Sequence, residues 1–95
     1  MTFDERVQEL APFRFTERQS RFLVNVMLHS GVFVGRQYCA ASGIEYGANV
    51  QQFLSTLERR KFATPQRSAH GRGRLYHVHF KPLYDAIGER DNRLR

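Results

Sequence analysis

The sequence predicts a small α+β domain in which short helices surround one β-hairpin. Two observations carry this prediction. Residues 35–61 contain two helical segments joined by a glycine-containing turn. After Lys61 the spacing of apolar residues changes from a helical period of about 3.6 to a strand period of about 2. With 95 residues, the chain has the size of one domain with one modest core.

The composition favours an anionic partner. The formal net charge is +6, which points first to nucleic acid and second to an acidic protein or an anionic membrane surface. A basic protein without such a partner is the alternative. No apolar run approaches the roughly 18–20 residues of a membrane span, and the acidic N-terminus lacks the apolar centre of a signal peptide. The single cysteine, Cys39, excludes an internal disulfide, so we expect a cytoplasmic protein.

Residues 1–13 are predicted to form an accessory helix. Residues 2–5 have the spacing of a capping box, and the helix should end before Pro12 because the residue preceding proline disfavours helical geometry. This helix must dock either on its own domain or on a second subunit. The apolar residues on which docking depends are Phe3, Val7 and Leu10.

Residues 14–95 are assigned to the main domain, so the chain is one domain overall. A second capping box at residues 16–19 opens a helix from Glu17 to about His29, and Gly31 suits a left-handed C-terminal cap. The wide apolar stripe of this helix predicts that it is the central core helix. Its members are Phe22, Leu23, Val26 and Met27.

The next segment contains a short strand and two helices. Residues 32–34 are apolar and suit a strand, and Gly35 opens a helix to Ser42 that is expected to turn Tyr38, Cys39 and Ala41 inward. Gly43-Ile44 forms the turn, and a second helix follows over residues 47–60. The apolar side of that second helix consists of Val50, Phe53, Leu54 and Leu57.

The last part of the chain predicts a hairpin and a helix. Strands are expected over residues 62–66 and 74–80, and Pro65 favours an edge position. Glycines and small polar residues make the connection between them a hairpin loop. Pro82 begins a final helix, whose apolar side is formed by Leu83, Tyr84 and Ile87.

This order of elements resembles a winged helix-turn-helix domain over about residues 16–87. The resemblance is carried by the turn at residues 40–44, the apolar stripe of helix 47–60 and the basic hairpin closing on residues 76–78. More narrowly, the chain is similar to MarR-like regulators and to the winged-helix domains of plasmid replication–relaxation proteins. Two departures are an extra residue between Gly43 and Val50, and cysteine where alanine is usual.

The resemblance implies three core helices and a β-hairpin wing, with added N- and C-terminal helices. It also implies a DNA-binding, nucleoid-associated transcriptional or replication regulator that acts on double-stranded DNA as a homodimer. The apolar sides of the accessory and final helices are the candidates for the dimer surface. The alternative is a protein-interaction module of a larger assembly, without specific DNA binding. RNA binding is a weaker alternative because no strand carries an obvious set of stacking aromatics.

Helix 47–60 is expected to enter the major groove with its polar face. Asn49 and Gln52 carry amides that suit adenine, whereas Arg59 and Arg60 lie at the far end, near backbone phosphates or the negative helix terminus. Ordinary solvated side chains are the alternative. The residues expected to contact DNA from this segment are Tyr46, Asn49, Gln51, Gln52, Ser55, Thr56 and Arg59.

The basic wing, residues 66–75, is expected to contact the DNA backbone or minor groove. From Arg59 to Lys81 there are seven Lys or Arg residues and no Asp or Glu, which favours sequence-independent affinity. The expected contacts are Arg67, His70, Arg72 and Arg74. A second basic group at Arg14, Arg18 and Arg21 suits either phosphate contact or solubility.

Enzyme chemistry has little support in the sequence. There is no phosphate-binding glycine loop, nucleophile elbow or useful carboxylate pair, so we expect neither catalysis nor a cofactor. His77 and His79 share a strand face, but a metal site usually needs three or four ligands, and no metal is expected. Cys39 has apolar neighbours and is interpreted as a buried thiol rather than a redox sensor.

Overall fold

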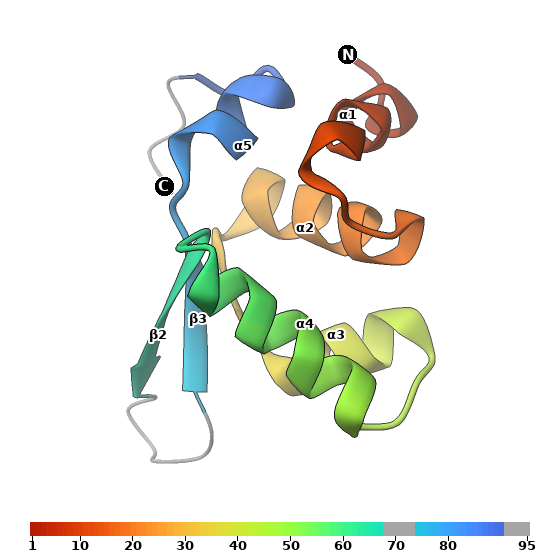
Figure 1. Ribbon diagram of the computed structural model, residues 1–95. Helices are drawn as coiled ribbons and strands as arrows, with labels where there is room; N and C mark the ends of the chain where they lie inside the picture. The colour runs from red at the N-terminus through yellow and green to blue at the C-terminus, as the bar shows by residue number, and fades with distance from the viewer. Residues whose placement is uncertain (68–73, 91–95) are drawn as a thin grey trace.

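The structure is a computed structural model that describes residues 1–67 and 74–90, except for the side chain of Arg67. Within those residues it is an α+β domain with five α-helices and a three-stranded antiparallel sheet (Figure 1), which confirms the predicted α+β class. The elements in chain order are α1 (Phe3–Glu9), a 3₁₀ turn (Ala11–Phe13), α2 (Glu17–His29), β1 (Val32–Val34), α3 (Gly35–Ser42), α4 (Ala48–Arg59), β2 (Ala63–Arg67), β3 (Arg74–Val78) and α5 (Lys81–Ala86).

The first two helices begin where the sequence predicts. The backbone N–H of Glu5 donates to Thr2 Oγ1 (3.1 Å), and Thr2 N–H donates to Glu5 Oε1 (2.9 Å). Thr16 and Gln19 make the same reciprocal pair at 3.1 and 3.0 Å. These bonds satisfy N–H groups that have no partner within the helix, so both predicted capping boxes are confirmed.

Helix α2 is the centre of the core. In Figure 1 it lies between α1 and α5 on one side and α3 and α4 on the other. Leu23, Val24 and Met27 are fully buried, as expected for a helix surrounded in this way. At its end Gly31 takes a left-handed conformation (φ 73°), and its N–H donates to Val26 O at 2.8 Å. The predicted glycine cap is therefore confirmed.

The sheet has the strand order β1-β3-β2, so β3 is central. Phe33 on β1 lies opposite Tyr76 on β3, and their rings stack with centroids 5.5 Å apart. On the other side of β3, Tyr76 pairs with Pro65 of the edge strand β2. An edge position tolerates the missing N–H of proline, and it confirms the prediction for this residue.

The apolar sides of α1 and α5 face the core of their own chain. Arg6 Nη1 donates to Ile87 O (2.6 Å) and pairs with Glu89 Oε1 (3.1 Å), which ties α1 to the end of α5. Phe3, at the start of α1, is 36% exposed to solvent. The prediction that these two helices offer their apolar stripes to a second subunit is therefore wrong for the side chains buried within the chain. These are Val7, Leu10, Leu83, Tyr84 and Ile87.

Helices α3 and α4 follow their predicted apolar faces unequally. All four residues of the α4 stripe are buried, which confirms that face. On α3, Tyr38 is buried and Cys39 is half-buried, but Ala41 is exposed. Around the helix, Tyr38, Ser42 and Cys39 span about 100°, and Ala41 lies about 60° beyond the Tyr38 edge of this inward face. The prediction for Ala41 is wrong.

Candidate functional site

The exposed surface of α4 divides into three sectors, because successive residues turn by about 100° around a helix. Ser55 and Arg59 point directly away from the buried stripe. Asn49 and Thr56 lie on the side that faces the start of α2, together with Gln52. Gln51 and Glu58 lie on the side that faces the hairpin. The predicted DNA contacts of α4 are thus spread around one helix rather than gathered in one row.

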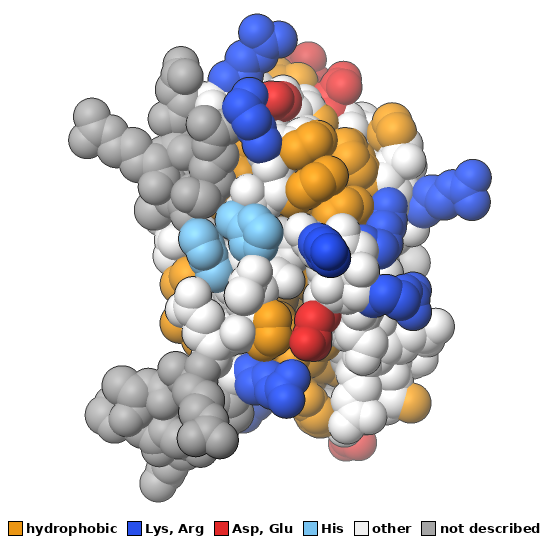
Figure 2. Space-filling view, turned by 60° about the vertical axis from the view of Figure 1, so that its left-hand side comes forward, with side chains coloured by type: hydrophobic (Ala, Val, Ile, Leu, Met, Phe, Trp, Pro, Cys, Tyr) orange, Lys and Arg blue, Asp and Glu red, His pale blue; other side chains and the backbone are white. Residues whose placement is uncertain are grey.

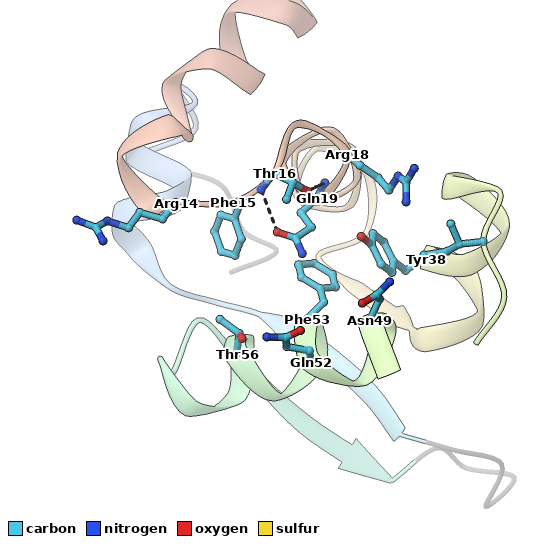
Figure 3. A pocket seen from close by; sticks show the side chains of 11 residues that line it. Arg14, Phe15, Thr16, Arg18, Gln19, Tyr38, Asn49, Gln52, Phe53 and Thr56 are labelled. Atoms are coloured by element: carbon cyan, nitrogen blue, oxygen red, sulfur yellow. Dashed lines mark hydrogen bonds between the residues drawn. The ribbon is translucent and has the colours of Figure 1, made fainter. Parts of the chain in front are cut away.

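A groove of about 580 Å³ separates α4 from the start of α2 (Figure 3). We call it the α2–α4 groove. Phe15 and Phe53 meet edge to face within it, with ring centroids 6.3 Å apart, and give it an apolar floor. Its lining residues are Arg14, Phe15, Thr16, Arg18, Gln19, Tyr38, Ile44, Asn49, Gln52, Phe53 and Thr56. The structure therefore brings Asn49, Gln52 and Thr56 together, but it places Gln51 and Ser55 outside this groove.

Tyr38 supplies a phenol to the α2–α4 groove. Burial raises the pKa of Tyr38, and this effect is partly offset by the nearby Arg18 guanidinium and by hydrogen bonds with Ser42 and Gln19. The phenol consequently stays neutral at physiological pH, where it can donate or accept a hydrogen bond.

A second groove, of about 630 Å³, lies between α4, the start of α3 and the hairpin. We call it the α4–hairpin groove. The Tyr46 side chain is 54% exposed, and its ring passes over Gly35, where a Cβ atom would lie 2.9 Å from Tyr46 Cε2. Glycine thus permits this close approach. The lining residues are Val34, Gly35, Arg36, Tyr46, Leu54, Arg74 and Tyr76.

The α4–hairpin groove brings two predicted residues, Tyr46 and Arg74, together with one that sequence reasoning missed. Arg36 lies in the first turn of α3 and faces the same groove. A basic residue beside Gly35, at the start of the first helix of the pair, was the available signal. Three side chains suited to phosphate contact therefore border this groove.

Glu58 was also missed, because the basic run used to predict DNA contacts starts one residue later, at Arg59. Glu58 Oε2 lies 3.8 Å from Arg74 Nη1, and their side chains are 45% and 63% exposed. An exposed pair of this kind contributes only about 0–1 kcal/mol to stability. It nevertheless places a negative charge beside one of the predicted contacts.

Burial raises the pKa of Tyr76 in the same groove, an effect that Arg74 partly offsets.

Arg59 and Arg60 have different environments. Arg59 is exposed, as predicted. Arg60 instead donates from Nη1 to Phe13 O (2.7 Å), and its guanidinium lies 4.3 Å from the Phe62 ring centroid and 5.5 Å from that of Phe15. The expectation that Arg60 meets backbone phosphates or the helix terminus is wrong. Arg60 lies about 100° around the helix from the exposed Arg59, and this rotation turns its side chain toward the core.

The hairpin predictions are covered only in part. The side chain of Arg67 and the residues His70 and Arg72 lie outside the described residues, whereas the backbone of residue 67 pairs with Arg74. The ring centroids of His77 on β3 and of His79, which follows this strand, lie 5.7 Å apart, and His79 Nε2 is 2.6 Å from Thr64 Oγ1. Within residues 1–67 and 74–90, no three His, Cys, Asp or Glu side chains gather as metal ligands would.

Positive charge is distributed widely over the face shown in Figure 2. Lys and Arg side chains recur from the top to the lower part of this view, with acidic side chains between them. Several of the arginines are paired: Arg6 with Glu89, Arg21 with Asp4, and Arg74 with Glu58. Net charge alone therefore does not locate a binding surface, and the geometry of the grooves must do so.

No match was found when the chain was compared with protein-family models, curated proteins and solved structures. None of the helices in the described part of the chain is both long and apolar enough to cross a membrane. The function is therefore inferred from the arrangement of the chain's own residues.

Proposed function

We propose that this chain is a winged helix-turn-helix domain that binds double-stranded DNA. Helices α3 and α4 would form the helix-turn-helix pair, and the β2–β3 hairpin would be the wing. One observation carries the proposal. The polar face of α4 is exposed between two grooves, and arginine side chains border both of them.

The dimensions of an α-helix support the proposal. A helix with its side chains is about 10–12 Å across, and the major groove of B-DNA is about 12 Å wide. The start of α4 carries Asn49 and Gln52, whose amides can pair with the adenine edge. Tyr46, Arg36 and Arg74 border the α4–hairpin groove, and in this proposal they would contact phosphates and fix the orientation of the helix.

The biological role proposed is regulation of transcription or replication, by a dimer reading a pseudo-palindromic site. The dimer surface would involve parts of the chain other than the buried stripes of α1 and α5. The resemblance to MarR-like and plasmid replication–relaxation domains remains a prediction from the sequence.

A second candidate function follows from the α4–hairpin groove. Val34 and Leu54 line it, and the exposed Tyr46 ring lies at its edge. Such a surface also suits an apolar side chain of a partner protein. Under this alternative the domain is a protein-interaction module. The wild type then binds no DNA, and Tyr46→Ala abolishes binding of the partner protein.

Selection from a random duplex pool tests the proposal. We expect the wild type to enrich a defined sequence. Replacing Asn49 and Gln52 together by alanine should abolish the enrichment and leave non-specific affinity nearly unchanged, because base contacts specify and phosphate contacts do not. The matched control replaces Gln8 and Asn25, two exposed amides on α1 and α2, and should keep the enrichment. Failure of the wild type to bind any duplex at low salt refutes the proposal.

A further inference from the structure

Two exposed arginines, Arg14 just before α2 and Arg18 in its first turn, lie on the side of α4 that faces away from the hairpin. Figure 3 shows them on either side of the helix start, both extending outward. Within the part of the chain that the structure describes, neither guanidinium forms an ion pair with a carboxylate. Arg21, one turn further along α2, is different, because its Nη1 lies 3.0 Å from Asp4 Oδ1. The rim of the α2–α4 groove therefore carries two positive charges that are not paired with any carboxylate of residues 1–67 and 74–90.

Among the described residues that line the α2–α4 groove, none has an acidic side chain. Between the two arginines it presents neutral hydrogen-bonding groups, among them the phenol of Tyr38 and the hydroxyl of Thr56. Two cations with neutral donors between them suit an extended anion with several acceptor oxygens. A phosphodiester backbone has this chemistry.

We propose that the α2–α4 groove receives the phosphate backbone of the second DNA strand. The inference rests on the proposed function. With α4 in the major groove, one DNA strand runs along each side of the helix. The α4–hairpin groove, with Arg36 and Arg74, faces the first strand, and the α2–α4 groove, with Arg14 and Arg18, faces the second. Because the helix nearly fills the major groove, side chains on both of its flanks reach phosphates.

This arrangement assigns a function to a basic group that the hairpin and α4 do not account for. Arg14 and Arg18 contribute affinity that falls with salt, since each neutralised phosphate releases counterions. They contribute little to the choice of sequence, which depends on base edges. Asn49 and Gln52 lie between these arginines and the base pairs, so the backbone contact also sets the depth at which α4 enters.

The test compares the wild type with a variant in which Arg14 and Arg18 are both alanine. Binding to one selected duplex is followed by fluorescence anisotropy across a series of NaCl concentrations. The slope of log K against log[salt] should become shallower by about 1.8, that is about 0.9 for each lost phosphate contact. The double variant Arg21→Ala/Arg90→Ala removes the same charge from exposed positions elsewhere and should keep the wild-type slope.

Two further measurements make the test specific. In an ethylation-interference experiment, Arg14→Ala/Arg18→Ala should lose interfering phosphates on one strand only. The variant Arg14→Lys/Arg18→Lys keeps both charges and should retain most of the slope, which separates lost charge from lost folding. A wild-type slope in the alanine variant, or an equal loss in the Arg21/Arg90 control, overturns the inference and leaves the proposed function standing. A wild type that binds no duplex overturns both.

Discussion

Replacing Arg60 should destabilise the fold much more than replacing Arg59, although the two residues are neighbours. Arg60 donates a 2.7 Å hydrogen bond to Phe13 O, and its guanidinium lies over the Phe62 and Phe15 rings. A hydrogen bond from a charged donor contributes about 1.5–3 kcal/mol. Each cation–π contact adds about 0.5–1 kcal/mol at a partly exposed site. We therefore expect Arg60→Ala to lower the free energy of unfolding by about 2.5–5 kcal/mol.

The assay is urea and thermal unfolding of both variants, followed by circular dichroism. Arg59→Ala is the matched control and should change stability by no more than about 0.5 kcal/mol, since Arg59 is exposed. A loss of 1 kcal/mol corresponds to a fall in Tm of about 4–8 °C for a domain of this size. Arg60→Lys keeps the charge but not the planar guanidinium, and should fall between the two. Equal stabilities for Arg59→Ala and Arg60→Ala would refute the assigned role.

Three other substitutions give separate tests. Glu58→Gln removes the negative charge beside Arg74, so DNA affinity should rise at low salt while stability changes by only about 0–1 kcal/mol; unchanged affinity in a binding titration counts against the α4–hairpin groove. Gly35→Ala places a Cβ atom 2.9 Å from Tyr46 Cε2, so the Tyr46 ring resonances should shift in NMR spectra, and an unmoved ring contradicts this packing. Gly43→Ala meets no atom within 4 Å but must adopt φ 66°, which should cost about 1–2 kcal/mol, with Gly43→Asn costing less; an equal loss from both would rule out backbone strain as the cause.

The sequence predicted those elements whose signal is local. The capping boxes at residues 2–5 and 16–19 place helix starts through bonds between residues three apart, so no tertiary information is needed. The buried stripe of α4 follows from helical periodicity, and the edge position of Pro65 follows from its missing N–H.

The errors occur where packing between distant segments decides the outcome. Arg60 looks like a surface arginine until the 3₁₀ turn brings the carbonyl of Phe13 to it, 47 residues away in the chain. The stripes of α1 and α5 look like spare apolar faces until both helices pack on one core, joined by Arg6. The local sequence of either segment does not indicate that it will pack against the other.

The candidate site was predicted as a set of residues but not as an arrangement. Most of the polar positions named on α4 are exposed, yet the structure separates those beside α2 from those beside the hairpin. The basic residue Arg36 and the acidic residue Glu58 were missed, because each matters only through its contacts across the α4–hairpin groove.

The central claim is that this chain binds duplex DNA through α4 and the groove-lining arginines on its two flanks. Its most direct test is the equilibrium affinity of the wild-type chain for duplex DNA, measured from about 50 to 200 mM salt. Proteins with 6–10 phosphate contacts lose roughly 10³–10⁵ in affinity over this range. We expect tight binding at low salt and a steep linear fall of log K against log[salt]. Absence of binding at 50 mM salt, or an affinity independent of salt, would contradict the claim.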